Sequence, residues 1–286
     1  MKLNMTNTTP LKIAVLVSGS GSNLQVLIDK QLQQLLNIQI VGVISNKADA
    51  YALERIRLAN EQQQANIATA VIERDDNGKK YTRVGFEQKA LAVLNEWQPD
   101  LVVLAGFMRI LTPLFIDGVT SSTGLNVPMI NLHPSLLPNY KGLATHTRVL
   151  QSGERYHGCS VHLVTSELDA GEVIAQAVTC VNAAESADQL QQRVHAMEHQ
   201  LLPMVVGLFA ERIVSLKNNQ LTNRLGLNLP IKLWLLSNYG SNQKTPIIKF
   251  RRFLCVSQFT LEVPIYSISR LAKIHSALPT RYLKMR

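Results

Sequence analysis

The sequence predicts an α/β fold, Rossmann-like, with a mostly parallel sheet flanked by helices. Short apolar runs alternate with longer amphipathic segments through the first 105 residues, as in strands joined by crossover helices. A turn rich in glycine and serine joins the first apolar run to the first amphipathic segment. Further along, an asparagine and a histidine follow another apolar run, at the carboxyl end of a strand where open α/β sheets bind ligands.

The first half of the chain supplies the alternating elements. Runs of four to eight residues rich in Val, Ile, Leu and Ala have the length of buried strands, and segments with apolar residues three or four apart have the period of helices. A polar loop at residues 75–80 separates two of them. The expected elements are strands at 12–17, 38–44, within 65–72 and at 101–105, and helices at 23–36, 50–63 and 83–97.

The second half is expected to add three strands and one long helix. Apolar residues at 127–130 form a short buried strand that leads into the asparagine and histidine. Residues 160–165 and 173–181 also have strand character, and residues 186–210 form a long amphipathic helix. Pro203 is expected to bend or break that helix, because proline has no N–H for the helical hydrogen bond.

The positive charge is concentrated in the C-terminal tail. The chain has 286 residues and a net charge of +9, yet residues 1–220 hold 18 Lys/Arg and 19 Asp/Glu, whereas residues 221–286 hold 11 basic residues and one acid. The main body therefore offers no basic face for nucleic acid. The tail has no sustained hydrophobic period. Three interpretations stay open for it: an appended basic module, a poorly ordered extension, or out-of-frame sequence downstream of a complete domain.

Composition also bears on the cellular compartment in which the protein is expected. Residues 1–10 are polar and lack the apolar core of a secretory signal. No apolar run approaches the roughly 20 residues of a membrane-spanning helix. Cys159, Cys180 and Cys255 are too far apart for a common metal motif or a disulfide framework, so free thiols in a reducing cytoplasm are expected.

The glycine-rich turn, Ser-Gly-Ser-Gly-Ser-Asn at residues 18–23, has the composition of a phosphate site. Glycines let the backbone approach an anion, and the N-terminus of the following helix offers free N–H groups. A P-loop is excluded because no lysine is present. A dinucleotide site is disfavoured because Leu24 replaces the third glycine and residues 45–47, Ser-Asn-Lys, lack the ribose-binding acid. A monophosphate is the preferred ligand, and a tight turn with a helix cap is the alternative.

Asn131 and His133 form the second candidate site. Side chains alternate along a strand, so the two project from the same face, and Pro134 then ends the strand pairing. An amide donor beside an imidazole suits a reaction that develops an oxyanion and moves a proton. Asp169, directly after another apolar strand, is the candidate carboxylate partner, with a solvated turn acid as the alternative.

Five motifs occur in an order that resembles a known family. They are Ser-Gly-Ser-Gly-Ser-Asn-Leu from residue 18, Ser-Asn-Lys-Ala from 45, Leu-Ala-Gly-Phe-Met-Arg-Ile-Leu from 104, Asn-Leu-His-Pro-Ser-Leu-Leu-Pro from 131, and Glu-Leu-Asp-Ala-Gly from 167. Together they resemble the phosphoribosylglycinamide formyltransferases (GAR transformylases) of purine synthesis. The His-Pro-Ser-Leu-Leu-Pro piece alone is shared across the formyltransferase superfamily. The resemblance implies the formyltransferase fold, with a catalytic domain at 11–218 and a basic C-terminal extension at 219–286 that is poorly ordered or foreign to the family.

The resemblance also implies a reaction. The formyl group of 10-formyltetrahydrofolate, the co-substrate, would pass to the amine of 5-phosphoribosylglycinamide without a metal ion. Asn131, His133 and Asp169 would be catalytic, and Gly21, Ser22, Asn23 and Glu198 would bind the acceptor. His146 and His162 match supporting positions. The residues implied for the folate site are Arg83, Met108, Arg109, Ile110, Leu111, Asn131, Thr165, Ser166, Glu167, Leu168 and Asp169. A cytoplasmic enzyme of small-molecule substrates, monomer or homodimer, with no membrane or nucleic-acid partner for the main domain, is expected.

Three departures from the family pattern bear on the alternatives. The segment 117–127 is longer than expected and should alter a surface loop only, Ala144 stands where a histidine is common, and the tail has no family counterpart. A methionyl-tRNA formyltransferase would use a basic C-terminal domain on tRNA, but about 66 tail residues show no run of five alternating strands. A formyltetrahydrofolate hydrolase would carry an N-terminal regulatory domain. A nucleic-acid-binding module that is not an enzyme would rest on the tail alone.

Overall fold

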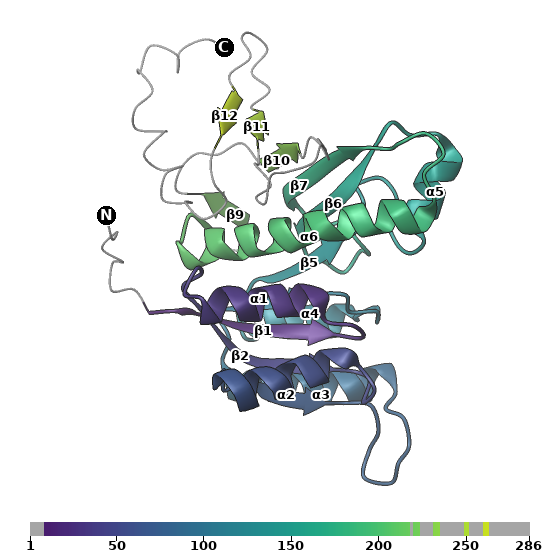
Figure 1. Ribbon diagram of the computed structural model, residues 1–286. Coiled ribbons are helices and arrows are strands. Elements are labelled where there is room, and N and C mark those ends of the chain that lie inside the picture. Colours follow the sequence, from purple (N-terminus) through teal and green to yellow (C-terminus); the bar gives the residue numbers. More distant parts are fainter. Residues whose placement is uncertain (1–8, 218–219, 224–230, 235–248, 252–259, 263–286) are drawn as a thin grey trace.

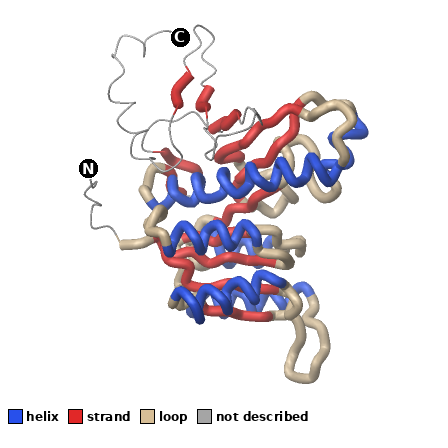
Figure 2. Tube along the Cα trace, in the orientation of Figure 1, coloured by secondary structure: helices blue, strands red, loops and turns tan. Residues whose placement is uncertain are grey.

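The computed structural model describes residues 9–217, 220–223, 231–234, 249–251 and 260–262. A twisted sheet runs through the molecule, with helices on both faces (Figure 1; Figure 2 marks strands and helices by colour). The strands are β1 (Leu11–Val17), β2 (Ile38–Ser45), β3 (Ala68–Val71), β4 (Leu101–Leu104), β5 (Met129–His133), β6 (Tyr156–Leu163), β7 (Val173–Cys180), β8 (Val214–Lys217), β9 (Gln220–Asn223), β10 (Ile231–Trp234), β11 (Lys249–Arg251) and β12 (Thr260–Glu262). The helices are α1 (Ser22–Leu32), α2 (Tyr51–Gln63), α3 (Arg83–Trp97), α4 (Pro113–Thr120), α5 (Thr145–Ser152) and α6 (Ala187–Ala210).

The sheet is mostly parallel, as predicted. Its order is β12-β11-β10-β7-β6-β5-β4-β1-β2-β3, and β8 and β9 form a separate hairpin. All pairs from β3 to β5 are parallel, whereas β6 is antiparallel to both β5 and β7. The strand order reverses between β1 and β4, and the carboxyl ends of β1, β4 and β5 therefore meet at one edge. This is the edge where parallel α/β sheets bind ligands.

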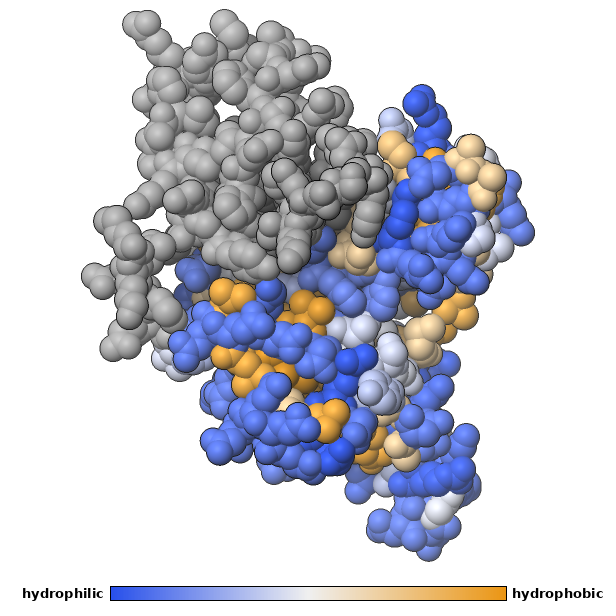
Figure 3. All heavy atoms as spheres, viewed as in Figure 1, coloured by the Kyte–Doolittle hydropathy of each residue, from blue (hydrophilic) through white to orange (hydrophobic). Residues whose placement is uncertain are grey.

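Alternation along β1 shows why both faces of the sheet need helices. Ile13, Val15 and Val17 are buried in one core with α1, α2 and α6, whereas Ala14 and Leu16 are buried in a second core with α3 and α4. Such a strand has no solvent face, which explains its continuous apolar sequence. On the molecular face in Figure 3, most described residues are hydrophilic and apolar side chains show in patches between them.

The expected strands and helices of the first 105 residues are all present, with α3 at its predicted bounds. The helix at 187–210 continues through Pro203, so of the predicted bend or break the break is wrong. One lost N–H donor is offset by burial of neighbouring apolar residues such as Leu201, Leu202 and Val205 in the core. Helices α4 and α5 were not expected from the sequence because each has only eight residues, too few to show a period.

The longer segment at 117–127 folds back on α4. The backbone N–H of Leu125 donates to Gly118 O (2.9 Å) and that of Val127 donates to Val119 O (2.9 Å). The extra residues therefore close a compact turn before β5.

Part of the C-terminal tail extends the sheet. Strand β10 pairs in parallel with β7, and β11 and β12 follow in antiparallel pairing. These short strands were not expected, because their sequence shows no clear alternation. Cys255 and most of residues 219–286 lie outside the described residues, as does the choice among the three interpretations of the tail. Within the described part of the chain, no helix combines the length and apolar character that crossing a bilayer requires.

Candidate active site

The glycine-rich turn between β1 and α1 is fixed by glycine geometry and by α2. Gly21 caps α1 with φ of +67°, and a Cβ there would lie 2.5 Å from Cβ of Ala52. Both facts require glycine at this position. The N–H of Ala52 donates to Gly19 O (3.1 Å), and Nε of Arg55 donates to Ser20 O (2.7 Å). The turn is therefore held in one conformation at the positive end of α1.

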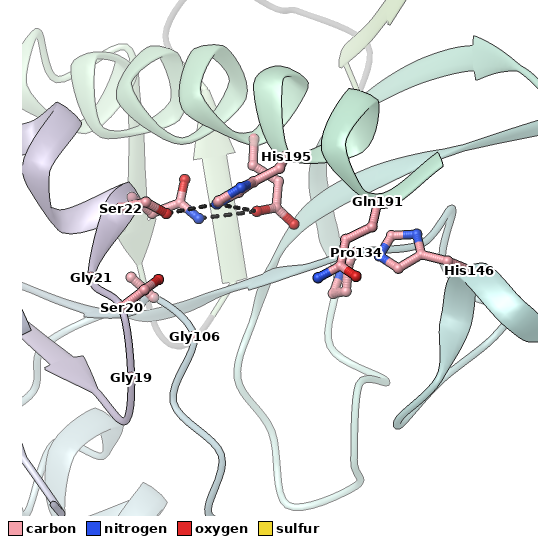
Figure 4. A pocket seen from close by; sticks show the side chains of 12 residues that line it. Gly19, Ser20, Gly21, Ser22, Gly106, Pro134, His146, Gln191 and His195 are labelled. Carbon is pink, nitrogen blue, oxygen red and sulfur yellow. Dashed lines mark hydrogen bonds and ion pairs between the residues drawn. The ribbon is translucent and has the colours of Figure 1, made fainter. Parts of the chain in front are cut away.

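A surface pocket opens beside this turn, between α1 and α6 (Figure 4). The four residues predicted for acceptor binding, Gly21, Ser22, Asn23 and Glu198, all line it. The pocket also contains residues that sequence reasoning did not assign to the site: Gly106, Pro134, Gln191 and His195. His195 lies three residues before Glu198, one helical turn away on the same face of α6, and that spacing was the available signal.

Ser22, Asn23, His195 and Glu198 form what we name the loop cluster. Asn23 Nδ2 donates to Glu198 Oε2 (3.0 Å), and Ser22 Oγ shares a hydrogen bond with His195 Nε2 (2.6 Å). Figure 4 shows Ser22 and His195 pointing toward one another across the pocket. Burial raises the pKa of Glu198 to about 7, against the hydrogen bond from Asn23 that lowers it. This carboxyl therefore changes protonation state near neutral pH.

The loop cluster also has polar atoms that are available to hydrogen-bond a ligand. Asn23 Oδ1 is buried and has no hydrogen-bond partner among the described residues. His195 keeps 42% of its side chain exposed, and burial of the remainder lowers its pKa. Polar atoms left open toward a pocket are typical of a site that binds a polar ligand.

Asn131, His133, His162 and Asp169 form the strand cluster. Asn131 and His133 project from β5 as predicted, and His162 stands directly opposite Asn131 on β6. Asp169 reaches them from the turn between β6 and β7, with Oδ2 3.4 Å from His133 Nδ1 and Oδ1 3.5 Å from Asn131 Nδ2. The structure thus brings together the three residues that were predicted to be catalytic.

The ring of His133 lies between two oxygen atoms. Its Nε2 lies 3.0 Å from Tyr140 O, and its Nδ1 faces the Asp169 carboxylate. A neutral imidazole has one N–H donor, whereas an imidazolium has two. Two oxygen acceptors therefore suit the protonated ring.

His162 is held in the opposite state. Its Nδ1 lies 2.8 Å from Leu163 O, which only a protonated nitrogen satisfies, so Nε2 is left to accept from Asn131 Nδ2 at 3.1 Å. Burial lowers the pKa of His162, which favours this neutral form. His162 thereby orients the Asn131 amide, the supporting role expected for it.

Asp169 has an unusual backbone conformation, and its side chain accepts a backbone hydrogen bond. Its φ is +50°, a left-handed conformation that is uncommon for a residue other than glycine. The N–H of Gly142 donates to Asp169 Oδ2 at 2.9 Å. Such strain is kept where the surrounding structure enforces it, and it clusters at functional sites.

Residues implied for the folate site lie on two segments. Met108 and Ile110 are exposed, at 67% and 55%, while Leu111 is buried. The guanidinium of Arg109 lies 4.7 Å from the ring centre of Phe86, which sits one turn after Arg83 on α3. The 108–111 segment and the start of α3 are therefore neighbours.

The second segment is the turn that carries Asp169. Thr165 Oγ1 donates to Glu167 O (3.2 Å), and Glu167 pairs with Lys141 (2.9 Å). Leu168 keeps 48% of its surface exposed, and Ser166 is also exposed. Apolar side chains exposed beside the strand cluster suit a flat, partly apolar ligand.

His146 lies between the pocket and a second histidine. It lines the pocket, and its Nδ1 lies 2.9 Å from Nε2 of the buried His157. Burial lowers the pKa of both rings, that of His157 to about 3. Among the described residues, no group of three or more His, Cys, Asp or Glu is placed to hold a metal ion.

A glycine-rich turn at a helix N-terminus suits an anion, and the Asn–His–Asp cluster beside it suits a reaction that develops an oxyanion and moves a proton. The sequence profile of the formyl transferase family matches residues 11–206, and the chain belongs to that family. The predicted fold class and family are thereby confirmed.

Individual relatives agree. The chain is 40% identical to the phosphoribosylglycinamide formyltransferase of Escherichia coli over 209 residues, 73% of this chain and 92% of that protein. It is also 40% identical to the human trifunctional purine biosynthetic protein adenosine-3, over 73% of this chain and 19% of that protein. The solved structure of the Coxiella burnetii phosphoribosylglycinamide formyltransferase is 43% identical and matches with a TM-score of 0.64, over 75% of this chain and 93% of that one.

Proposed function

We propose that the chain transfers the formyl group of 10-formyltetrahydrofolate to the amine of 5-phosphoribosylglycinamide, a step of purine biosynthesis. The observation that carries the proposal is the loop cluster beside the strand cluster, because its position at the start of α1 and its open polar atoms suit a small phosphate. Pro134, which directly follows His133, lines the same pocket, so an acceptor bound there has its reactive end near the strand cluster. Relatives named phosphoribosylglycinamide formyltransferase support this acceptor over tRNA or water.

The acceptor is held at both ends of its pocket in this proposal. N–H groups of Gly21, Ser22 and Asn23 bind the phosphate at the start of α1. Glu198 accepts hydrogen bonds from the remainder of the substrate. The formyl donor lies against Met108 to Leu111 and the turn at 165–169, with Arg83 at the rim.

The chemistry belongs to the strand cluster. The acceptor amine attacks the formyl carbon, a C–N bond forms, and negative charge develops on the formyl oxygen. One N–H of Asn131 is directed to His162, and the second N–H of the same amide, whose Nδ2 is 3.5 Å from Asp169, is the donor assigned to the oxyanion. Protonated His133 adds positive charge beside it.

Proton movement follows from the His133–Asp169 pair. Asp169 takes the proton from the attacking amine, directly or through water, and His133 next to it returns a proton to the folate nitrogen as the C–N bond of the donor breaks. Proton and charge then balance without a metal.

The experiment offers the purified full chain 10-formyltetrahydrofolate with phosphoribosylglycinamide, initiator tRNA and water as competing acceptors. Formyl transfer to phosphoribosylglycinamide alone is expected. Transfer mainly to tRNA, or release of formate at a comparable rate, contradicts the proposal.

We propose further that residues 11–218 form the catalytic domain and that 219–286 are an extension. The family match ends at residue 206, and each residue of the loop and strand clusters precedes that point. A chain ending at residue 217 is expected to fold and to keep formyl transfer within about threefold of the full chain. An insoluble or inactive product would show that the extension, including β10 on the edge of β7, is part of the domain.

We also propose that the protein is cytoplasmic and that it is a monomer or a homodimer. Two well-separated thiols, Cys159 buried and Cys180 exposed, are free, which suits a reducing compartment. Light scattering at several protein concentrations tests the assembly state, and a stable tetramer would contradict it.

A further inference from the structure

We propose that Ser18 is a positioning residue that joins the phosphate loop to the wall of the formyl-donor site. The inference rests on the proposed function, because it concerns the placement of the two substrates relative to one another. Ser18 directly follows β1 and begins the turn that binds the acceptor.

The side chain of Ser18 is buried and holds two other strand ends together. Its hydroxyl donates to Asn46 Oδ1 (2.6 Å), just after β2, and accepts from the backbone N–H of Met108 (2.8 Å), beyond β4. Only 3% of Ser18 is exposed. Because a hydroxyl has a single proton, the bond to Asn46 fixes that proton and leaves a lone pair for Met108.

The donor wall is fixed at its far end as well. Glu87 on α3 accepts from Thr112 N (2.8 Å) and from Thr112 Oγ1 (2.5 Å). Hydrogen bonds thus fix the backbone of residues 108–112 at both ends. Within this segment, the side chains of Met108 and Ile110 are exposed toward solvent and available to a ligand.

Ser18 therefore belongs to both substrate sites. Its backbone leads into Gly19, which α2 holds through the N–H of Ala52 (3.1 Å), while its hydroxyl sets the position of Met108. Transfer between two bound substrates depends steeply on their separation, and a misplacement of about 1 Å can cost about 10²-fold. A direct bond between the two sites keeps that separation constant.

The test replaces Ser18 by Ala in the full chain and measures kcat and both KM values. The variant removes the acceptor of the Met108 N–H, a loss on the scale of about tenfold. We expect KM for 10-formyltetrahydrofolate to rise about tenfold, with KM for phosphoribosylglycinamide within about twofold of the wild type. Equal rises in both KM values, or no change in either, would overturn the proposal.

Asn46 provides a graded second test, which also applies if the Ser18 variant does not fold. Asn46→Ala removes the acceptor that orients the Ser18 hydroxyl and should raise the donor KM about threefold. Asn46→Asp keeps an acceptor oxygen and should restore the donor KM to near the wild-type value. The same donor KM in both Asn46 variants would contradict the proposed role of the hydroxyl orientation.

Ser45→Ala is the matched control. Ser45 is fully buried at the end of the neighbouring strand, and its hydroxyl donates to Lys47 O (2.7 Å). Its loss should lower thermal stability without a change in donor KM. An inactive wild type would contradict the proposed function itself, whereas an active wild type with a Ser18→Ala donor KM equal to that of Ser45→Ala would contradict only the role of Ser18.

Discussion

The loop cluster and the strand cluster contain the same three kinds of side chain, an asparagine, a histidine and a carboxylate, in different surroundings. In the strand cluster, Asp169 receives a backbone N–H at 2.9 Å and has two side-chain nitrogens that can donate, Asn131 Nδ2 and His133 Nδ1, within 3.5 Å. In the loop cluster, Glu198 receives one amide N–H at 3.0 Å, with His195 at 4.0 Å. Both carboxylates are buried, so the number of donors is the main difference.

That difference separates the tasks of the two clusters. Several donors hold the Asp169 carboxylate in a fixed position beside His133 and Asn131. A buried carboxyl with one donor shifts toward its neutral form, as the raised pKa of Glu198 shows. The strand cluster is therefore suited to chemistry and the loop cluster to binding.

The largest effect is expected from Asp169→Asn. The amide keeps the size of the side chain but cannot accept a proton, so kcat should fall by about 10²–10⁴ with folding nearly intact. Steady-state kinetics and circular dichroism measure the two properties. Glu172→Gln, an exposed carboxylate three residues later that is outside both clusters, is the control and should remain near wild type. Wild-type turnover in the Asp169 variant would remove the distinction between the clusters.

A smaller effect is expected on stability from Glu198→Gln. Burial raises the Glu198 pKa from 4.5 to about 7, so the folded state holds a proton that the unfolded chain has released between these values. Wild-type stability therefore falls as pH rises through this window, by up to about 3 kcal/mol above pH 7. Glutamine carries no such penalty. Urea unfolding should show the variant to be more stable at pH 8, with the difference vanishing below about pH 4.5.

Urea unfolding of Glu198→Gln can also contradict the expected effect on stability. A Glu198→Gln variant that is less stable than the wild type at pH 8 would mean that the carboxylate is stabilised as an anion. That result would contradict the raised pKa of Glu198.

The smallest effect is expected from His195→Ala. Loss of one hydrogen bond to Ser22 corresponds to roughly 0.5–1.5 kcal/mol, so acceptor KM should rise about two- to tenfold with kcat little changed. Gln192→Ala, an exposed position on the same helix that does not line the pocket, is the control. A drop in kcat at constant KM would place His195 with the chemistry instead.

The sequence alone was sufficient to predict those parts of the candidate site that come from residues close together in the chain. The proposed phosphate turn lies within six consecutive residues, and β5 places Asn131 and His133 two residues apart, so composition and strand period were enough to predict them as candidates. Asp169 needed the family resemblance, because the β5–β6 pairing that brings its turn to His133 joins residues about 30 apart in the chain. The structure then placed it within 3.4 Å.

The remaining parts of the site depend on packing between distant segments. The Ser18–Met108 bond joins residues 90 apart, and Ser22–His195 joins residues 173 apart. No spacing rule connects such pairs. Short helices α4 and α5 were missed for a related reason, since they are held by capping and tertiary contacts more than by a hydrophobic period.

The division between the clusters is tested most directly by single-turnover rates with both substrates saturating, for Asp169→Asn and Glu198→Gln side by side at pH 7.5. Saturation removes differences in binding, so the rate reports chemistry alone. The expected result is a fall of at least about 10² for Asp169→Asn and a rate within about fivefold of the wild type for Glu198→Gln. Equal losses in the two variants would contradict the assignment of chemistry to the strand cluster and binding to the loop cluster.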